Sequence, residues 1–302
     1  MNYAQITTSF RKEIWEFKKT LFWVPVIIAT FIIAIPFINL LLLDDSPFSR
    51  VLESAANVEN LENIEGVARF FLGALMGVFI PFVMVALVFQ LYYFTTCLFD
   101  ERRDLSVYFW RSLPVSDALT VTVKLMTGAL VVPAIFMLAA TFVVFVFLVL
   151  GLIACTVLSV GYDVSLWGIW VNAEIFTNLA AIWLNLLPYA LWMFPVFAWL
   201  MLASMFAYKA PFLWAVLPLV AIILVESFIV EYLHLDGRFI STLLHDYFSF
   251  SESMLPHDFA DIESPKFIVF SLISSKVSAI ATLIGVGLMC VTYWLRVNRS
   301  HG

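Results

Sequence analysis

The chain has 302 residues, of which 63% are hydrophobic and 13% are charged, with 16 basic and 22 acidic side chains. Soluble domains carry roughly a quarter charged residues, so this composition excludes a water-soluble domain built around one core. It also excludes a disordered chain, a collagen and a disulfide-rich scaffold. The composition therefore predicts an integral membrane protein.

Six windows of the chain carry no charge: 20–43, 70–99, 125–162, 175–208, 210–225 and 277–295. A hydrocarbon layer about 30 Å thick needs about 20 apolar residues in a helix, so five windows span it outright. The window at 210–225 spans it if the apolar run continues past Glu226 to Glu231. Residues 130–151 lack the two-residue alternation of a barrel strand. We expect an all-α integral membrane protein, one transmembrane domain over 1–302, with six spans at 21–43, 70–96, 125–154, 178–205, 211–231 and 277–296.

The charges between the spans predict the orientation. Alternate segments share a compartment, and the set that contains both termini carries 11 of the 16 basic residues. Basic residues concentrate on the cytoplasmic side of membrane proteins, so we expect both termini in the cytoplasm of a cell with a bacterial inner membrane. The first apolar run is too long for a cleaved signal peptide and lacks a small-residue cleavage site.

Residues 9–20 place Phe10, Ile14 and Phe17 on one face of a helix and charges on the others. This pattern predicts an N-terminal amphipathic interfacial helix, with Trp15 at the level of the lipid headgroups. The alternative is a simple positively charged anchor before the first span.

Within the spans, Gly73 and Gly77 form a GxxxG pair that is a possible helix contact. Glu226 is the one intramembrane carboxylate; we favour a satisfied or snorkelling side chain over a proton relay.

The outer segment 232–276 contains three histidines, but their spacing is not a ligand pattern, and we expect no metal. We expect three free thiols, since the three cysteines are far apart. The three histidines are His234, His245 and His257.

No constellation of the sequence indicates catalysis. None of the seven lysines follows a glycine, so these 302 residues contain no phosphate-binding loop of the GxxxxGK[ST] type. We therefore expect neither an enzyme nor a cofactor on this chain, and no nucleic-acid partner.

The cytoplasmic segment 97–124 carries the strongest functional signal. It opens with five consecutive charges at 100–104, continues with a Tyr-Phe-Trp cluster and breaks at Pro114, after which Ser116 can cap the next helix. Arginines alone would fit anionic lipid headgroups, but the interspersed acids would be repelled there. Mixed charges with aromatic residues are more typical of a surface that binds a protein.

The run DERRDLSVYFWRSLPVSD at 100–117 resembles the cytoplasmic loop between helices 2 and 3 of ABC-2-type transporter permeases. The resemblance implies a permease, and more specifically an exporter. Such a permease would form a homodimer and bind two copies of a separate ATPase that carries ATP and Mg²⁺. The 9–20 helix would lie alongside this loop, the turn near Lys209 would make a second contact, and 231–276 would cap the exit. The residues it assigns to ATPase coupling are Asp100, Glu101, Arg102, Arg103, Asp104, Ser106, Phe109, Trp110, Arg111, Pro114 and Asp117.

Two other functions stay open at this point. An ion-coupled secondary transporter would use Glu226 as the coupling group, and a non-transporting scaffold or sensor would use the 97–124 loop to bind a signalling protein. The sequence does not indicate the transported substrate.

Overall fold

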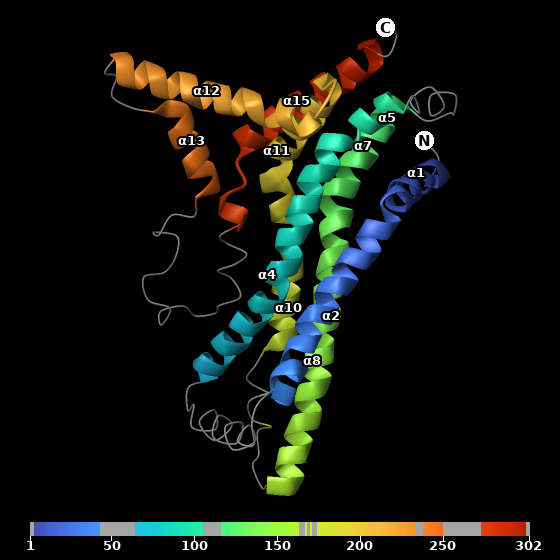
Figure 1. Cartoon of the computed structure of the whole chain (residues 1–302), viewed down its shortest axis with the longest axis vertical. Coiled ribbons are helices and arrows are strands. Elements are labelled where there is room, and N and C mark those ends of the chain that lie inside the picture. Colours follow the sequence, from blue (N-terminus) through green and yellow to red (C-terminus); the bar gives the residue numbers. More distant parts are fainter. Residues whose placement is uncertain are drawn as a thin grey trace. The chain divides into compact units, whose positions relative to one another are not determined.

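The computed structural model describes residues 3–42, 64–104, 116–162, 167, 170, 174–233, 238–249 and 273–299. Its regular elements in this part of the chain are all helices (Figure 1). In chain order they are α1 (Tyr3–Glu16), α2 (Lys18–Leu42), α4 (Ile64–Thr96), α5 (Phe99–Arg103), α7 (Asp117–Met126), η1 (Thr127–Val131), α8 (Val132–Tyr162), α10 (Ile175–Leu184), α11 (Leu186–Phe206), α12 (Pro211–Leu233), α13 (Phe239–Phe248) and α15 (Ala279–Arg299).

Within the described residues, six helical stretches are long and apolar enough to cross a membrane. The all-helical, six-span prediction is thereby confirmed, although several boundaries differ by a few residues. The fourth stretch is interrupted at Asn185, between α10 and α11. The six stretches are Lys18–Ile38, Phe71–Arg103, Asp117–Gly161, Ile175–Phe206, Pro211–Tyr232 and Ala279–Asn298.

The structure divides into two compact units. The first comprises the described residues of Met1–Glu16, Val88–Val131 and Asn185–Gly302, and the second those of Phe17–Leu87 and Val132–Leu184. The prediction of a single transmembrane domain stays a prediction.

In the first unit, α11 packs against α15 and α12, and α1 packs against α7. A Cβ on Gly285 would lie 2.6 Å from the ring of Phe194, so a glycine is needed where α15 meets α11. Phe94 of α4 stacks on Phe197 of α11 with ring centroids 4.5 Å apart. These contacts make α11 the centre of the first unit.

In the second unit, α2 packs against α8. Trp183 of α10 donates a hydrogen bond to Thr141 of α8 over 3.1 Å, and Trp170 donates to the Cys155 sulfur over 2.9 Å. Cys155, Cys97 and Cys290 are all free, which confirms the expected thiols.

A five-residue π-helix, η1, follows α7, a feature that sequence analysis did not predict. Pro133 has no N–H to donate to the carbonyl four residues earlier, which favours a wider turn just before it. Gln90 donates to the Gly128 carbonyl in this turn over 2.8 Å, and Tyr189 donates to Gln90 over 2.7 Å. The polar groups released by the π-turn are therefore satisfied within the first unit.

Candidate functional site

The predicted coupling residues that the structure describes lie at the two ends of the 100–117 loop. Asp100, Glu101, Arg102 and Arg103 belong to α5, and Asp117 opens α7. The Ser116 hydroxyl accepts a hydrogen bond from the Leu119 N–H over 3.2 Å, as the predicted cap requires. Five predicted coupling residues lie outside the described residues: Ser106, Phe109, Trp110, Arg111 and Pro114.

Glu101 lies at the centre of a buried ion-pair network, and its side chain is only 4% exposed. Its Oε1 lies 3.0 Å from Lys12 Nζ and 3.1 Å from Lys124 Nζ. Its Oε2 lies 3.0 Å from Arg296 Nη1. One carboxylate thus binds three cations, which come from α1, α7 and α15.

Glu13 of α1 is the second carboxylate of this network. Its Oε2 lies 3.0 Å from Lys124 Nζ and accepts a hydrogen bond from the Tyr93 hydroxyl over 2.9 Å. Its Oε1 lies 3.2 Å from Lys12 Nζ. Arg296 Nε also bonds Asp117 Oδ1 over 2.8 Å, so these contacts join three cations and three carboxylates, whose formal charges balance. Glu16 adds a fourth, more exposed carboxylate at the edge, 4.0 Å from Lys12 Nζ. We call these six residues the inner charge cluster: Lys12, Glu13, Glu101, Asp117, Lys124 and Arg296.

Neutrality explains how such charges can be buried. Removing an unpaired ion from water costs several kcal/mol, whereas a carboxylate surrounded by cations and hydrogen-bond donors recovers most of that cost. The cluster also brings together helix ends that are 89 to 195 residues apart in sequence. The end of α4, the start of α7, the end of α15 and the N-terminal helix therefore meet at one place in the first unit.

In the sequence, Lys124 and Arg296 are two of the 11 basic residues that predict the orientation, and Glu13 is one of the charges beside the apolar face of residues 9–20. Glu13 occupies the i+3 position between Phe10 and Ile14, and it is the residue of α1 that is buried, at 2% exposure. A charged residue at that position of the apolar face was the sequence feature that could have indicated a buried ion pair. Phe10 and Ile14 are half-buried and Trp15 is 62% exposed, so α1 is held to the protein by a charge as well as by its apolar face. The helix predicted over 9–20 is interrupted at Phe17, which lies between the end of α1 and the start of α2.

Arg102 extends the site toward the turn between α11 and α12. Its guanidinium donates to the Ser204 and Ala207 carbonyls over 2.7 and 2.9 Å. A cation is favourable there because the C-terminal carbonyls of a helix carry partial negative charge. The turn itself exposes Tyr208 and Lys209. The two segments to which the resemblance assigns ATPase contacts thus lie next to each other.

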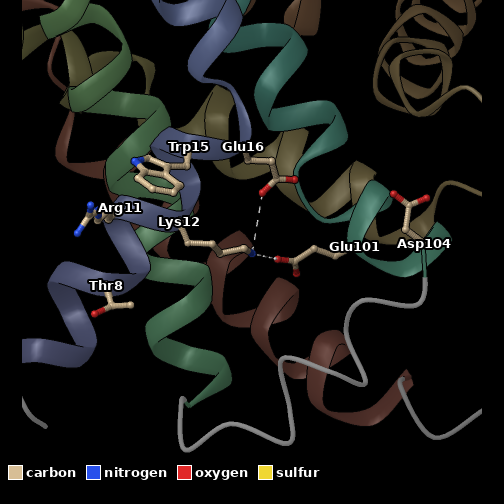
Figure 2. Close-up of a pocket in the computed structure, with 7 residues that line it drawn as sticks. All are labelled: Thr8, Arg11, Lys12, Trp15, Glu16, Glu101 and Asp104. Atoms are coloured by element: carbon tan, nitrogen blue, oxygen red, sulfur yellow. Dashed lines mark hydrogen bonds and ion pairs between the residues drawn. The ribbon is translucent and has the colours of Figure 1, made fainter.

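An open hollow of about 760 Å³ lies between α1 and the end of α5. Figure 2 shows Lys12 crossing it between Glu16 and Glu101, with Arg11, Trp15 and Thr8 along α1. Arg11 lies 4.9 Å from the centre of the Trp15 ring, a cation–π distance. Asp104 completes the rim of the hollow. Its side chain is 61% exposed, and that of the neighbouring Arg103 is 63% exposed. This hollow and its rim expose both signs of charge and an indole ring.

Glu226 has a different environment, next to the N-terminus of α13. Its carboxylate accepts the Ile240 N–H, the Ser241 N–H over 2.9 Å and the Ser241 hydroxyl over 2.8 Å. The residue at the N-cap position, Arg238, makes no side-chain cap, so Glu226 supplies the missing acceptor from α12. This contact accounts for a carboxylate in an apolar helix without a role in proton transfer.

The opposite end of α13 is held as well. Lys276 Nζ donates to the Asp246 carbonyl over 2.9 Å and to the Ser249 carbonyl over 2.5 Å. Tyr247 donates to the Trp192 carbonyl, and burial raises the pKa of the Tyr247 phenol to about 12. A carboxylate at the N-terminus and an ammonium at the C-terminus both match the helix dipole of α13.

Two further predictions concern the remaining site residues. A Cβ on Gly73 or Gly77 would meet nothing within 4 Å, so neither glycine is in close contact with another helix among the described residues. His245 is exposed and pairs with Asp246, while His234 and His257 lie outside the described residues. Among the described side chains, no group of three or more His, Cys, Asp or Glu residues is arranged to hold a metal ion.

These features define a multi-pass helical membrane protein with a neutral, buried charge cluster where several helix ends meet. Comparisons with protein families, curated proteins and solved structures gave no match.

Proposed function

We propose that this chain is the membrane-spanning permease subunit of an ATP-driven transporter of the ABC-2 type, acting as an exporter. One observation carries the proposal: Arg102 joins the start of the 100–117 loop to the Ala207–Ala210 turn. Residues of α5 contact this turn and also line the hollow along α1, and both places expose charged side chains and aromatic rings. We call this combined surface the docking face. Such a face suits a protein partner.

The orientation follows from the same contacts. The N-terminal helix and the end of the last span both contact Glu101, which supports placing both termini in one compartment. The excess of basic residues in that compartment favours the cytoplasm. In keeping with a permease of this type, we propose that the chain lies in the inner membrane of a bacterium. The docking face then points to the side where ATP is available.

The energy source lies on a partner. A separate ATPase in two copies would bind ATP and Mg²⁺, and two copies of this chain would form the translocation pathway as a homodimer. Closure of the ATPase dimer would pull on the 100–117 loop and shift the helices between inward-open and outward-open states. Gly73 and Gly77, beside which the described part of the chain leaves open space, would then contact the second copy.

The test is affinity isolation of the full chain from its own cells in mild detergent. We expect an ATPase with a phosphate-binding loop to be retained. The variant Arg103→Glu/Asp104→Lys keeps the net charge but reverses the exposed pair, and we expect about tenfold weaker retention. The matched control Glu231→Lys/Arg238→Glu also swaps two exposed charges and should retain the ATPase like the unmodified chain.

Repeated isolation of the unmodified chain without an ATPase would overturn the proposal. Recovery of a signalling protein instead would favour the scaffold function. Equal retention of the ATPase by the two swap variants would still support an ATPase partner, but it would contradict the proposal that this face binds it. Glu101 and Arg102 are unsuitable for this test, because both side chains make contacts within the chain and their reversal would disrupt the fold.

A further inference from the structure

Arg296, near the end of α15, contacts both ends of the segment that connects α5 to α7. Its Nη1 lies 3.0 Å from Glu101 Oε2, and its Nε lies 2.8 Å from Asp117 Oδ1. Glu101 lies in α5, before the segment, and Asp117 is the first residue of α7, after it. One guanidinium therefore joins two carboxylates that are separated by residues 102–116.

The geometry depends on the guanidinium. Its N–H donors are fixed in one plane, so two carboxylates bound to different nitrogens are held in a fixed arrangement relative to each other. An ammonium is a point charge on a flexible stem and imposes no such arrangement. The Arg296 side chain is 5% exposed, so water does not compete strongly for these bonds.

We propose that Arg296 is the positioning residue that holds the two ends of segment 102–116 together and connects them to the last span. This inference rests on the proposed function in one respect, namely that the segment binds the ATPase. The chain itself connects the segment to α4 and α7. α15 also packs against α7 and α11, and Arg296 is its direct side-chain link to both ends of the segment. Arg296 thereby gives a displacement of the segment a direct route to α15.

The neighbouring cations do not duplicate this role. Lys12 and Lys124 bind Glu101, whereas Arg296 binds both Glu101 and Asp117. Loss of the guanidinium would leave Glu101 with its two lysines only and would release the link between the two carboxylates. We therefore expect both ends of the segment to open more readily.

The first test is hydrogen exchange on the full chain in detergent, read at residues 99–104 and 117–126. We expect about tenfold faster exchange at both ends in Arg296→Gln and in Asp117→Asn. Arg296→Lys keeps the positive charge but loses the planar set of N–H donors, so it should behave like Arg296→Gln. Lys19→Gln, an exposed cation outside the cluster, is the control and should match the unmodified chain. Unchanged exchange in Arg296→Gln, or full rescue by Arg296→Lys, would overturn the inference.

The second test uses the complex with its ATPase and compares exchange with and without a non-hydrolysable ATP analogue. In the unmodified complex we expect the analogue to change exchange in α7 and α15. In Arg296→Gln the α7 response should persist and the α15 response should be reduced, which a purely stabilising side chain would not produce. An α15 response as large as that of the unmodified complex would overturn the inference.

The two tests separate the failure of this inference from that of the proposed function. If no ATPase is isolated with the chain, the proposed function fails. The first test needs no ATPase, so it still decides whether Arg296 is a positioning residue. If Arg296→Gln does not fold, Asp117→Asn replaces it, because Asp117 is the more exposed member of the pair at 22%.

Discussion

Two carboxylates in apolar surroundings, Glu101 and Glu226, are stabilised in different ways. Glu101 is buried and is bound by three cations from three helices. Glu226 is half-buried and is bound by the first N–H groups and a hydroxyl of one short helix. The first arrangement ties distant segments together, whereas the second joins two neighbouring helices.

This difference indicates where a disturbance would spread. A buried charge cluster shares its ions, so the loss of one member leaves another charge without full compensation. A helix cap serves one helix end, and its loss frays that end alone. We therefore expect cooperative effects at Glu101 and local effects at Glu226.

The largest expected effect comes from Lys124→Met, which removes the buried cation between Glu13 and Glu101. Because both carboxylates stay buried, we expect the chain to lose about 3–5 kcal/mol of stability. Thermal unfolding of the full chain in detergent, followed by circular dichroism, measures it. The control Lys209→Met removes an exposed lysine and should change stability by less than about 0.5 kcal/mol. Equal shifts in the two variants would contradict the buried cluster.

The next effect in size comes from Glu226→Ala, which removes the cap of α13. We expect roughly fivefold faster hydrogen exchange at Ile240 and Ser241, with exchange in α1 and α5 unchanged. Glu226→Gln keeps an acceptor oxygen and should show a smaller change. Glu231→Gln, an exposed acid on the same helix, is the control. Faster exchange in α5 would show that the two regions are not independent.

The smallest effect concerns Glu16, on the rim of the hollow and 41% exposed. Burial raises the pKa of its carboxyl above the ordinary 4.5, Lys124 and Lys12 oppose the rise, and Glu13 and Glu101 add to it. A raised folded-state pKa means that the proton binds the folded chain more tightly. This stabilisation is complete below the ordinary pKa and is lost as the pH rises through the raised one.

Glu16→Gln removes that titration. We therefore expect a shallower fall of the unfolding temperature just above pH 4.5 and a slightly higher unfolding temperature at neutral pH. A steeper fall in the variant would reverse the assigned direction.

The sequence was sufficient for the spans, because a membrane imposes its thickness on the apolar runs. It was also sufficient for the Ser116 cap, which depends on residues three positions apart. It did not predict the inner charge cluster, because two of the three partners of Glu101, Lys12 and Arg296, lie 89 and 195 residues away and only tertiary packing brings them together. The π-turn before Pro133 was missed for a related reason, since its freed carbonyl is satisfied by Gln90 from another helix.

The central claim is that the inner charge cluster acts as one unit, and a double-mutant cycle on thermal unfolding tests it most directly. Lys124 and Arg296 bind different oxygens of Glu101, so Lys124→Met and Arg296→Gln should be non-additive by about 1–3 kcal/mol. Lys124→Met combined with Glu226→Gln should be additive within about 0.5 kcal/mol. Additivity in the first pair, or strong coupling in the second, would contradict the account.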